Sequence, residues 1–187
     1  MPLLISNIKL SAKIPEKPLN EIKDRCRENQ IQFSTYNNFI VFRSSSFTFT
    51  VFKKKLLKNC DKNTVIKQHV NITVNSLEKI PEAIESLKKI LGYNKNINVH
   101  YKIDNLTATA SLDKKINVDL FLENTRDIAD QVSFNPEKFP AIFIKHKNRK
   151  ILLFRSGVLN ILGSKSTKEL DETYSWICTK CASIYSN

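Results

Sequence analysis

Two segments of the chain alternate apolar and polar residues with the period of two that is typical of half-buried β-strands. The first is 5–14, in which Ile8, Leu10, Ala12 and Ile14 would face a core. The second is 103–112, in which Leu106, Ala108, Ala110 and Leu112 take the same places. Asn7 and Asn105 open the polar faces of the two segments, about half the chain length apart. Self-similarity at such a spacing predicts an internal repeat.

The remaining predicted elements follow in the same order in both halves. They are a helix (19–28; 118–132), a hairpin (39–43 with 47–52; 141–145 with 150–154), a further strand (70–75; 158–162) and a closing amphipathic helix. Gly92 should end the first closing helix, and Ser166 with Glu169 forms a capping box for the second. The sequence therefore predicts an α+β fold of two pseudo-symmetric repeats, 1–93 and 94–187. The first repeat carries a lysine-rich insertion at about 53–68.

The strand face opposite the predicted helices has an unusual composition. The alternation assigns no Asp or Glu to it, whereas a solvated face without a function normally mixes both charges. It offers amide and hydroxyl groups, a few cations and several phenylalanines. Short polar groups that meet A·T acceptors, together with apolar wedges, are what minor-groove recognition requires. The pattern favours DNA as the ligand of this face.

Charge and composition further narrow the classes of function that the protein could have. The 187 residues carry a formal net charge of +12, which favours a polyanionic partner. An AT-rich genome, whose codons favour Lys, Asn and Ile, would give the same bias, so both explanations stay open. Only three glycines are present, which excludes a P-loop and a dinucleotide-binding fingerprint. No apolar run approaches a membrane span, and no basic segment precedes the apolar N-terminal stretch, so we expect a protein that stays inside the cell or virus factory.

Cysteines and histidines do not form a recognisable chemical site. The CTKC stretch around Cys178 and Cys181 has metal-ligand spacing, but a structural zinc site needs four ligands and no second pair exists. We expect core thiols, no cofactor and no metal. The three histidines fall in unrelated segments, and no catalytic spacing stands out, which argues against an enzyme.

The second half of the chain resembles the C-terminal repeat of the TATA-box-binding protein family. The similarity rests on four stretches, 101–106 (YKIDNL), 134–140 (FNPEKFP), 152–157 (LLFRSG) and 163–165 (GSK). The first half matches more thinly, through Asn7, Phe52 and Thr73. The resemblance implies one curved antiparallel sheet, a saddle, backed by helices. The Lys/Asn/Ile bias is similar to that of TATA-binding-like proteins of large nucleocytoplasmic DNA viruses.

The strand face opposite the predicted helices and the family resemblance together give the expected site residues. The DNA-binding residues are Asn7, Lys9, Arg43, Phe52, Thr73, Asn105, Thr107, Phe139, Lys145, Phe154, Asn160, Leu162 and Lys165. The resemblance further implies that Asn135, Glu137 and Lys138 bind a transcription factor IIB-like protein. It implies a transcription initiation factor on A·T-rich promoter DNA, working with RNA polymerase in the nucleus or in a cytoplasmic virus factory. The alternative is a protein-interaction module in an initiation complex that no longer bends DNA.

The chain departs from the family pattern in its first half. The family has two wedge phenylalanines in each repeat, and Phe139 and Phe154 fill both places in the second. In the first repeat Phe52 fills one, but Asn37 stands at the position equivalent to Phe139, and Tyr36 or Phe39 could replace it only with a shifted register. Leu162 replaces an expected threonine, and Lys9 and Thr107 replace small apolar groups. We therefore expect weaker bending, or bending that depends on a partner.

Overall fold

The computed structural model describes residues 3–53, 67–125 and 131–185. In these residues ten strands form one open antiparallel sheet, in the order β2-β3-β4-β5-β1-β6-β10-β9-β8-β7, with four helices. The strands are β1 (Leu4–Pro15), β2 (Phe33–Thr35), β3 (Phe39–Ser44), β4 (Phe47–Phe52), β5 (Lys67–Val74), β6 (Tyr101–Ser111), β7 (Gln131–Asn135), β8 (Phe139–His146), β9 (Arg149–Phe154) and β10 (Val158–Ser164). The helices are α1 (Leu19–Glu28), α2 (Ile80–Leu91), α3 (Val118–Thr125) and α4 (Thr167–Tyr185). The α+β class and the predicted sheet are confirmed.

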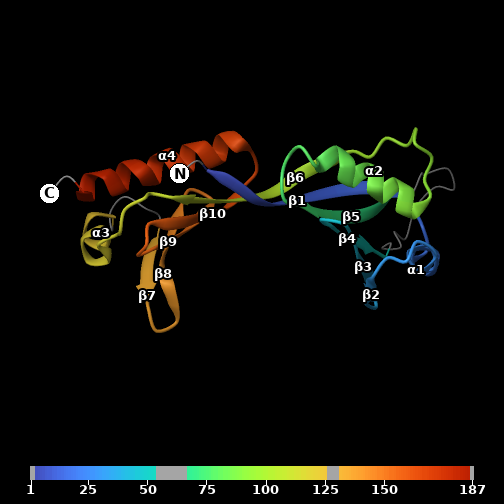
Figure 1. Ribbon diagram of the computed structural model, residues 1–187, viewed down its shortest axis with the longest axis horizontal. Helices are drawn as coiled ribbons and strands as arrows, with labels where there is room; N and C mark the ends of the chain where they lie inside the picture. Colours follow the sequence, from blue (N-terminus) through green and yellow to red (C-terminus); the bar gives the residue numbers. More distant parts are fainter. Residues whose placement is uncertain (1–2, 54–66, 126–130, 186–187) are drawn as a thin grey trace, which may run out of the picture. The chain divides into compact units, whose positions relative to one another are not determined.

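The chain divides into two compact units, one of residues 8–104 and one of residues 1–7 with 105–187. In the 8–104 unit, α2 packs against β5 and α1 against β3, on the same side of the strands (Figure 1). The core between these layers is aliphatic and aromatic, with Leu10, Phe42, Phe49 and Leu87 fully buried. Gly92 ends α2 in the left-handed conformation (φ 62°), which glycine adopts without strain.

In the 105–187 unit, α4 packs against β10 and α3 against α4 (Figure 1). The predicted capping box is present at the start of α4, where the Glu169 N–H donates to Ser166 Oγ at 3.2 Å. The Glu169 carboxylate accepts from the Lys165 N–H at 2.9 Å. These two bonds fix the turn between β10 and α4, so the position of Lys165 is set by the backbone.

The buried cysteines belong to the helix stripes. Cys26 of α1 and Cys181 of α4 are buried in the two units. Desolvation raises the pKa of the Cys26 thiol to about 11 and that of Cys181 to about 12. Both stay protonated near neutral pH and are poor nucleophiles and metal ligands. Across the three described ranges, no group of three His, Cys, Asp or Glu residues is placed to hold a metal ion.

Two short edge strands depart from the predicted elements. The predicted helix 118–132 is wrong at its last two residues: α3 is Val118–Thr125, residues 126–130 lie outside the described residues, and Gln131–Asn135 form β7 against β8. Its counterpart β2 was not predicted either. Both strands are short and half-exposed, so their sequences carry little periodicity and the neighbouring strand decides their conformation. Of the predicted insertion, β5 already includes Lys67 and Gln68, and residues 54–66 lie outside the described residues.

None of the helices within the described ranges is long and apolar enough to cross a membrane.

Candidate nucleic-acid interface

In the 8–104 unit, the uncovered strand face is built of cross-strand rows. In the first row Lys9 lies opposite Thr73, Thr73 opposite Thr48, and Thr48 opposite Arg43. Side chains that share such a register point to the same face of a sheet. Three predicted site residues, Lys9, Thr73 and Arg43, are therefore brought together in one line. This row has a cation at each end and hydroxyl groups between them.

Another cross-strand row of the same face is aromatic. Phe52 lies opposite Phe39, with ring centroids 5.7 Å apart, and the His69 ring lies 5.4 Å from Phe52 on its other side. Tyr36 stacks on Phe39 at 4.4 Å with planes 20° apart, and 53% of its surface is exposed. The rings thus form a continuous cluster, Tyr36–Phe39–Phe52–His69, which is called the aromatic row below.

The aromatic row supplies a second ring beside Phe52, which the sequence analysis did not assign to the first repeat. Phe154 pairs with Ala141, two residues after Phe139, and Phe52 pairs with Phe39, two residues after Asn37. The spacing argument that equates Asn37 with Phe139 is therefore consistent with the register. A second ring nevertheless meets Phe52, because Phe39 occupies the place that Ala141 has in the other unit. Sequence spacing alone did not reveal this pair, since the register decides which residue faces Phe52.

In the 105–187 unit, the polar groups of the uncovered face are hydrogen-bonded to one another. The Thr109 hydroxyl donates to Asn160 Oδ1 at 2.8 Å, from the strand directly opposite. A bulge between Ile161 and Ser164 frees the Gly163 N–H, which donates to Asn105 Oδ1 at 2.8 Å. The Asn105 amide group in turn donates to Thr107 at 3.2 Å. The acceptor end of Asn105 is thereby occupied, and Thr107 takes one of its two amino protons, so the second amino proton is left for a ligand with acceptors.

The cations of this unit also stand in one row. Leu162 lies opposite Lys150, and Lys150 lies opposite Lys145. Lys145 and Lys150 are exposed, as are Lys165 beyond β10 and Arg155 after β9. Two of these cations rest over rings: Lys150 Nζ lies 6.0 Å from the Phe143 centroid and the Arg155 guanidinium 6.0 Å from that of Phe134. The apolar stems cover the rings while the charges remain in solvent.

Phe139 and Phe154 form a ring pair in the 105–187 unit, in which Phe139 is exposed and Phe154 is half-buried. Their ring centroids are 6.0 Å apart, and 47% of the Phe139 surface is exposed. Phe139 is therefore not a core residue. A large apolar side chain in water is unfavourable unless a ligand covers it.

The remaining predicted positions are exposed or lie at strand ends. Asn7 is exposed on β1. Asn135, Glu137 and Lys138 are all exposed at the β7–β8 turn, where the Lys138 N–H donates to the Asn135 carbonyl at 3.1 Å. This turn presents Glu137 without covering it.

The acid-free description of the face needs one correction. The alternation placed Asp104 on the core side, but its Oδ1 accepts from the Ser11 hydroxyl at 3.1 Å, and Ser11 belongs to the polar side. Residues 103–105 are all half-buried, so the alternation fails at this point of β6. Lys102 Nζ lies 3.4 Å from the same carboxylate oxygen and offsets its charge.

Comparison with known proteins gives one family. A family model described as transcription factor TFIID (or TATA-binding protein, TBP) matches residues 100–183. The TATA-box-binding protein of Pyrococcus horikoshii is 30% identical over 89 residues, which are 46% of this chain and 44% of that protein. That of Pyrodictium occultum is 38% identical over 72 residues, covering 37% of this chain and 34% of the relative. The matched segments thus span less than half the length of these curated relatives.

The fold match extends over both units. Methanococcus jannaschii TBP superposes with a TM-score of 0.71 at 23% identity, covering 98% of this chain and 99% of that one. At this identity the similarity establishes the fold. It extends the likeness to the first half, which the sequence comparisons do not reach.

The exposure of Phe139 leads to a stability prediction. Phe139→Ala should lower the free energy of unfolding by about 1 kcal/mol or less, because much of the ring is already in water. Phe42→Ala, at a fully buried position of the other unit, should cost about 3–5 kcal/mol. Urea denaturation of both variants measures the difference. Equal losses would show that Phe139 supports the fold.

Proposed function

We propose that this chain, whose residues 100–183 match the TATA-binding protein family model, is a non-enzymatic transcription initiation factor that binds the minor groove of A·T-rich promoter DNA. The proposal rests mainly on the Phe139–Phe154 ring pair, with Phe139 exposed, beside a hydrogen-bonded polar face and a row of cations. It includes a transcription factor IIB-like partner and the RNA polymerase machinery. It places the protein where promoters are transcribed, in the nucleus or, if the protein is viral, in a virus factory.

The polar face suits the chemistry of A·T pairs. In the minor groove these pairs present only acceptors, adenine N3 and thymine O2, whereas guanine adds an amino donor. With Asn105 Oδ1 held by the Gly163 N–H and one amino proton given to Thr107, the second amino proton of Asn105 can donate to such an acceptor. The Thr107 hydroxyl, which accepts from Asn105, can likewise donate its own proton. A guanine amino group would meet few free acceptors on this surface, which favours A·T over G·C.

The phenylalanine pair suits the mechanics of bending. Opening a base step costs a few kcal/mol, which apolar insertion and phosphate contacts must offset. Phe139 is exposed beside the half-buried Phe154, so insertion covers apolar surface that would otherwise stay in water. The aromatic row of the 8–104 unit offers a second pair, Phe39 with Phe52, at the end of its polar rows.

The cations give the sequence-independent part of binding. Arg43, Lys145, Lys150, Arg155 and Lys165 lie at hairpins and strand ends around the polar faces. Lysine and arginine at such rims neutralise phosphates and release counterions. A transcription factor IIB-like partner would dock at the β7–β8 turn, where Glu137 projects into solvent.

The first test is binding selectivity and its dependence on salt. The chain should bind an A·T-rich duplex more tightly than a G·C-rich one, with affinity falling steadily as salt rises. Lys145→Ala should lower the salt slope by about one, because one phosphate contact is lost. Lys89→Ala, on an exposed position of α2, serves as the control and should leave the slope unchanged. An affinity independent of salt would contradict DNA binding, and partner binding without it would favour the interaction-module alternative.

The second test concerns the wedges. Phe139→Ala and Phe154→Ala should each weaken duplex binding by a few kcal/mol and reduce the bend, because base-step insertion is lost. Phe39→Ala should reduce the bend further if the aromatic row also opens a step. Resonance energy transfer between dyes at the duplex ends measures the bend. Normal bending by Phe139→Ala would remove this ring from the mechanism.

The third test concerns the partner. Glu137→Lys should weaken the complex with the transcription factor IIB-like protein by at least about tenfold, since reversing a charge places like charges opposite each other. Glu123→Lys makes the same charge change at an exposed position of α3 and is the matched control. A pull-down with both variants separates a local effect from net charge. Equal retention of the partner by both would place docking on another surface.

A further inference from the structure

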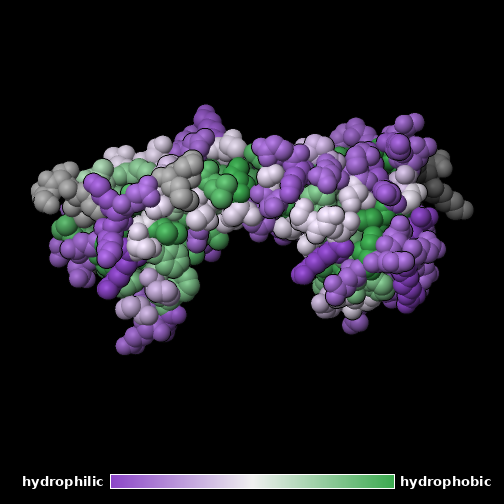
Figure 2. Space-filling view, viewed as in Figure 1, coloured by the Kyte–Doolittle hydropathy of each residue, from purple (hydrophilic) through white to green (hydrophobic). Residues whose placement is uncertain are grey.

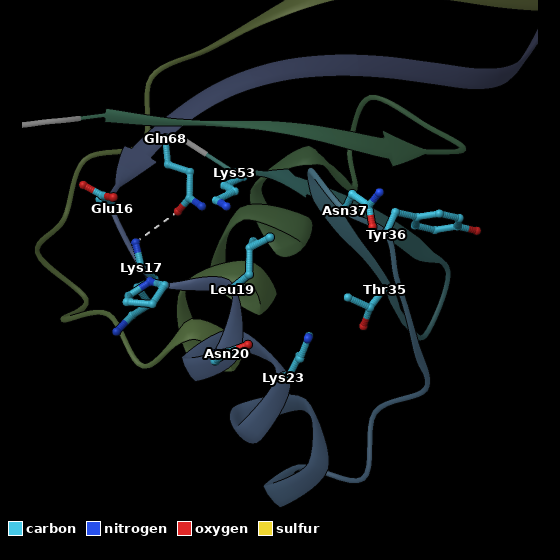
Figure 3. A pocket seen from close by; sticks show the side chains of 11 residues that line it. Glu16, Lys17, Leu19, Asn20, Lys23, Thr35, Tyr36, Asn37, Lys53 and Gln68 are labelled. Carbon is cyan, nitrogen blue, oxygen red and sulfur yellow. Dashed lines mark hydrogen bonds between the residues drawn. The ribbon is translucent and has the colours of Figure 1, made fainter. Parts of the chain in front are cut away.

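A cavity of about 670 Å³ opens in the 8–104 unit, at the first turn of α1. Its walls come from that turn, from the β2–β3 connection, and from the ends of β4 and β5 (Figure 3). The residues that matter for its chemistry are Lys17, Leu19, Lys23, Lys53 and Gln68. This space is called the lysine cavity below.

Hydrogen bonds hold the wall of the lysine cavity in place. Gln68 is only 2% exposed, and its side chain ties two segments together. Its Oε1 accepts from the Lys17 N–H at 3.0 Å, and its Nε2 donates to the Phe52 carbonyl at 2.9 Å. The Lys53 N–H donates to the Asn38 carbonyl at 2.6 Å. These bonds fix the segments on which the cavity side chains stand, so a ligand would meet a preformed shape.

Among the described residues that line it, the lysine cavity carries more positive than negative charge. Lys17, Lys23 and Lys53 line it with a single carboxylate, Glu16. Lys17 pairs with Glu21 of α1. Across the described ranges, neither the Lys23 nor the Lys53 ammonium group has a hydrogen-bond or ion-pair partner. Two cations from separate elements that converge on one hollow create a local positive potential.

The lysine cavity also has an apolar contact surface. The Leu19 side chain extends into the space between Lys53 and Lys23 (Figure 3), and Pro18 also lines the cavity. Leu19 is only half-buried, so the cavity keeps an uncovered aliphatic group next to its two cations. Hydrophilic side chains dominate the visible surface around α1 (Figure 2), so the cavity has a polar surround.

We infer that the lysine cavity docks an acidic segment of a partner protein, with carboxylates at Lys23 and Lys53 and one apolar side chain against Leu19. The charge complementarity selects an anionic occupant, and the aliphatic group selects a polypeptide. A duplex backbone supplies phosphates but no apolar group to cover Leu19. Tyr36 of the aromatic row also lines this cavity, but Lys23, Lys53 and Leu19 belong to neither the polar rows nor the β7–β8 turn, so they add a contact beyond those of the proposed function.

The test uses the intact chain and a dye-labelled synthetic peptide of Asp and Glu residues with one central Phe. Fluorescence anisotropy gives its affinity for the wild type and for Lys23→Glu and Lys53→Glu. Each cavity variant should bind at least about tenfold more weakly, since attraction becomes repulsion. Lys89→Glu makes the same charge change at an exposed position of the same unit and should change the affinity by less than about twofold.

A second pair of measurements tests the apolar contact. Leu19→Ala should weaken binding of the Phe peptide, and replacing the Phe by Ser in the peptide should weaken binding to the wild type. When Leu19→Ala is combined with the Ser peptide, the two losses of affinity should not add, because each change removes the same contact between Leu19 and the Phe of the peptide. Thermal melting of every variant, together with the uncharged changes Lys23→Gln and Lys53→Gln, separates loss of binding from loss of folding.

Three outcomes would overturn the inference. The first is that the wild type fails to bind the acidic peptide. The second is that Lys89→Glu weakens binding as much as the cavity variants do, which would indicate general charge attraction. The third is that the cavity variants lower the affinity for an A·T-rich duplex while the peptide affinity stays unchanged, which would make the lysines phosphate contacts. Duplex binding by the wild type is measured in parallel. Its absence with peptide binding intact would refute the proposed function and leave the cavity assignment standing.

Discussion

In the described residues of each unit, helices pack on one side of the strands, and the alternation of buried and outward-facing residues along the strands follows from this. Aliphatic side chains such as Leu10, Ile72, Leu106 and Ile161 fill the covered side and are fully buried. The residues between them face outward and need not be apolar. Since a slip of one residue would exchange the two faces, burial of the aliphatic side also fixes the register of the outward one. The polar rows and the aromatic pairs are positioned by that register.

The two uncovered faces use the same backbone plan with different side-chain chemistry. In the 105–187 unit, Thr109, Asn160, Asn105 and Gly163 satisfy one another, so the amide and hydroxyl groups have defined orientations before any ligand arrives. Such preorganisation reduces the ordering cost of binding. In the 8–104 unit, rings continue from Tyr36 through Phe39 and Phe52 to His69. The polar face of the 105–187 unit is suited to hydrogen bonding, and the aromatic row of the 8–104 unit is suited to stacking.

The two proposals assign the surface cations to two kinds of partner. Arg43, Lys145 and Lys150 lie on cross-strand rows of the polar faces, which is the arrangement proposed for phosphate contacts. Lys23 and Lys53 instead converge on a hollow with an aliphatic side chain between them. The net charge of +12 describes both groups equally. Only the shape beneath the charges separates a nucleic-acid contact from a polypeptide contact.

The sequence by itself determined the features that depend on local periodicity. The alternation at 5–14 and 103–112, the stripe of α2 with its stop at Gly92, and the capping box at Ser166 all predict their elements, because each rests on residues close together in the chain. The four matching stretches of the second half likewise indicate the family, and the exposed place of Phe139 follows from its alternation.

Tertiary structure decided what depends on pairing between distant residues. The edge strands β2 and β7 form because β3 and β8 offer them partners. Phe39 meets Phe52 because the register of β3 on β4 sets them opposite each other, and the contact of Asp104 with Ser11 arises where β6 loses its alternation. The lysine cavity gathers residues from four separate segments. Periodicity assigns a face to a residue, but only the packed chain assigns its neighbours.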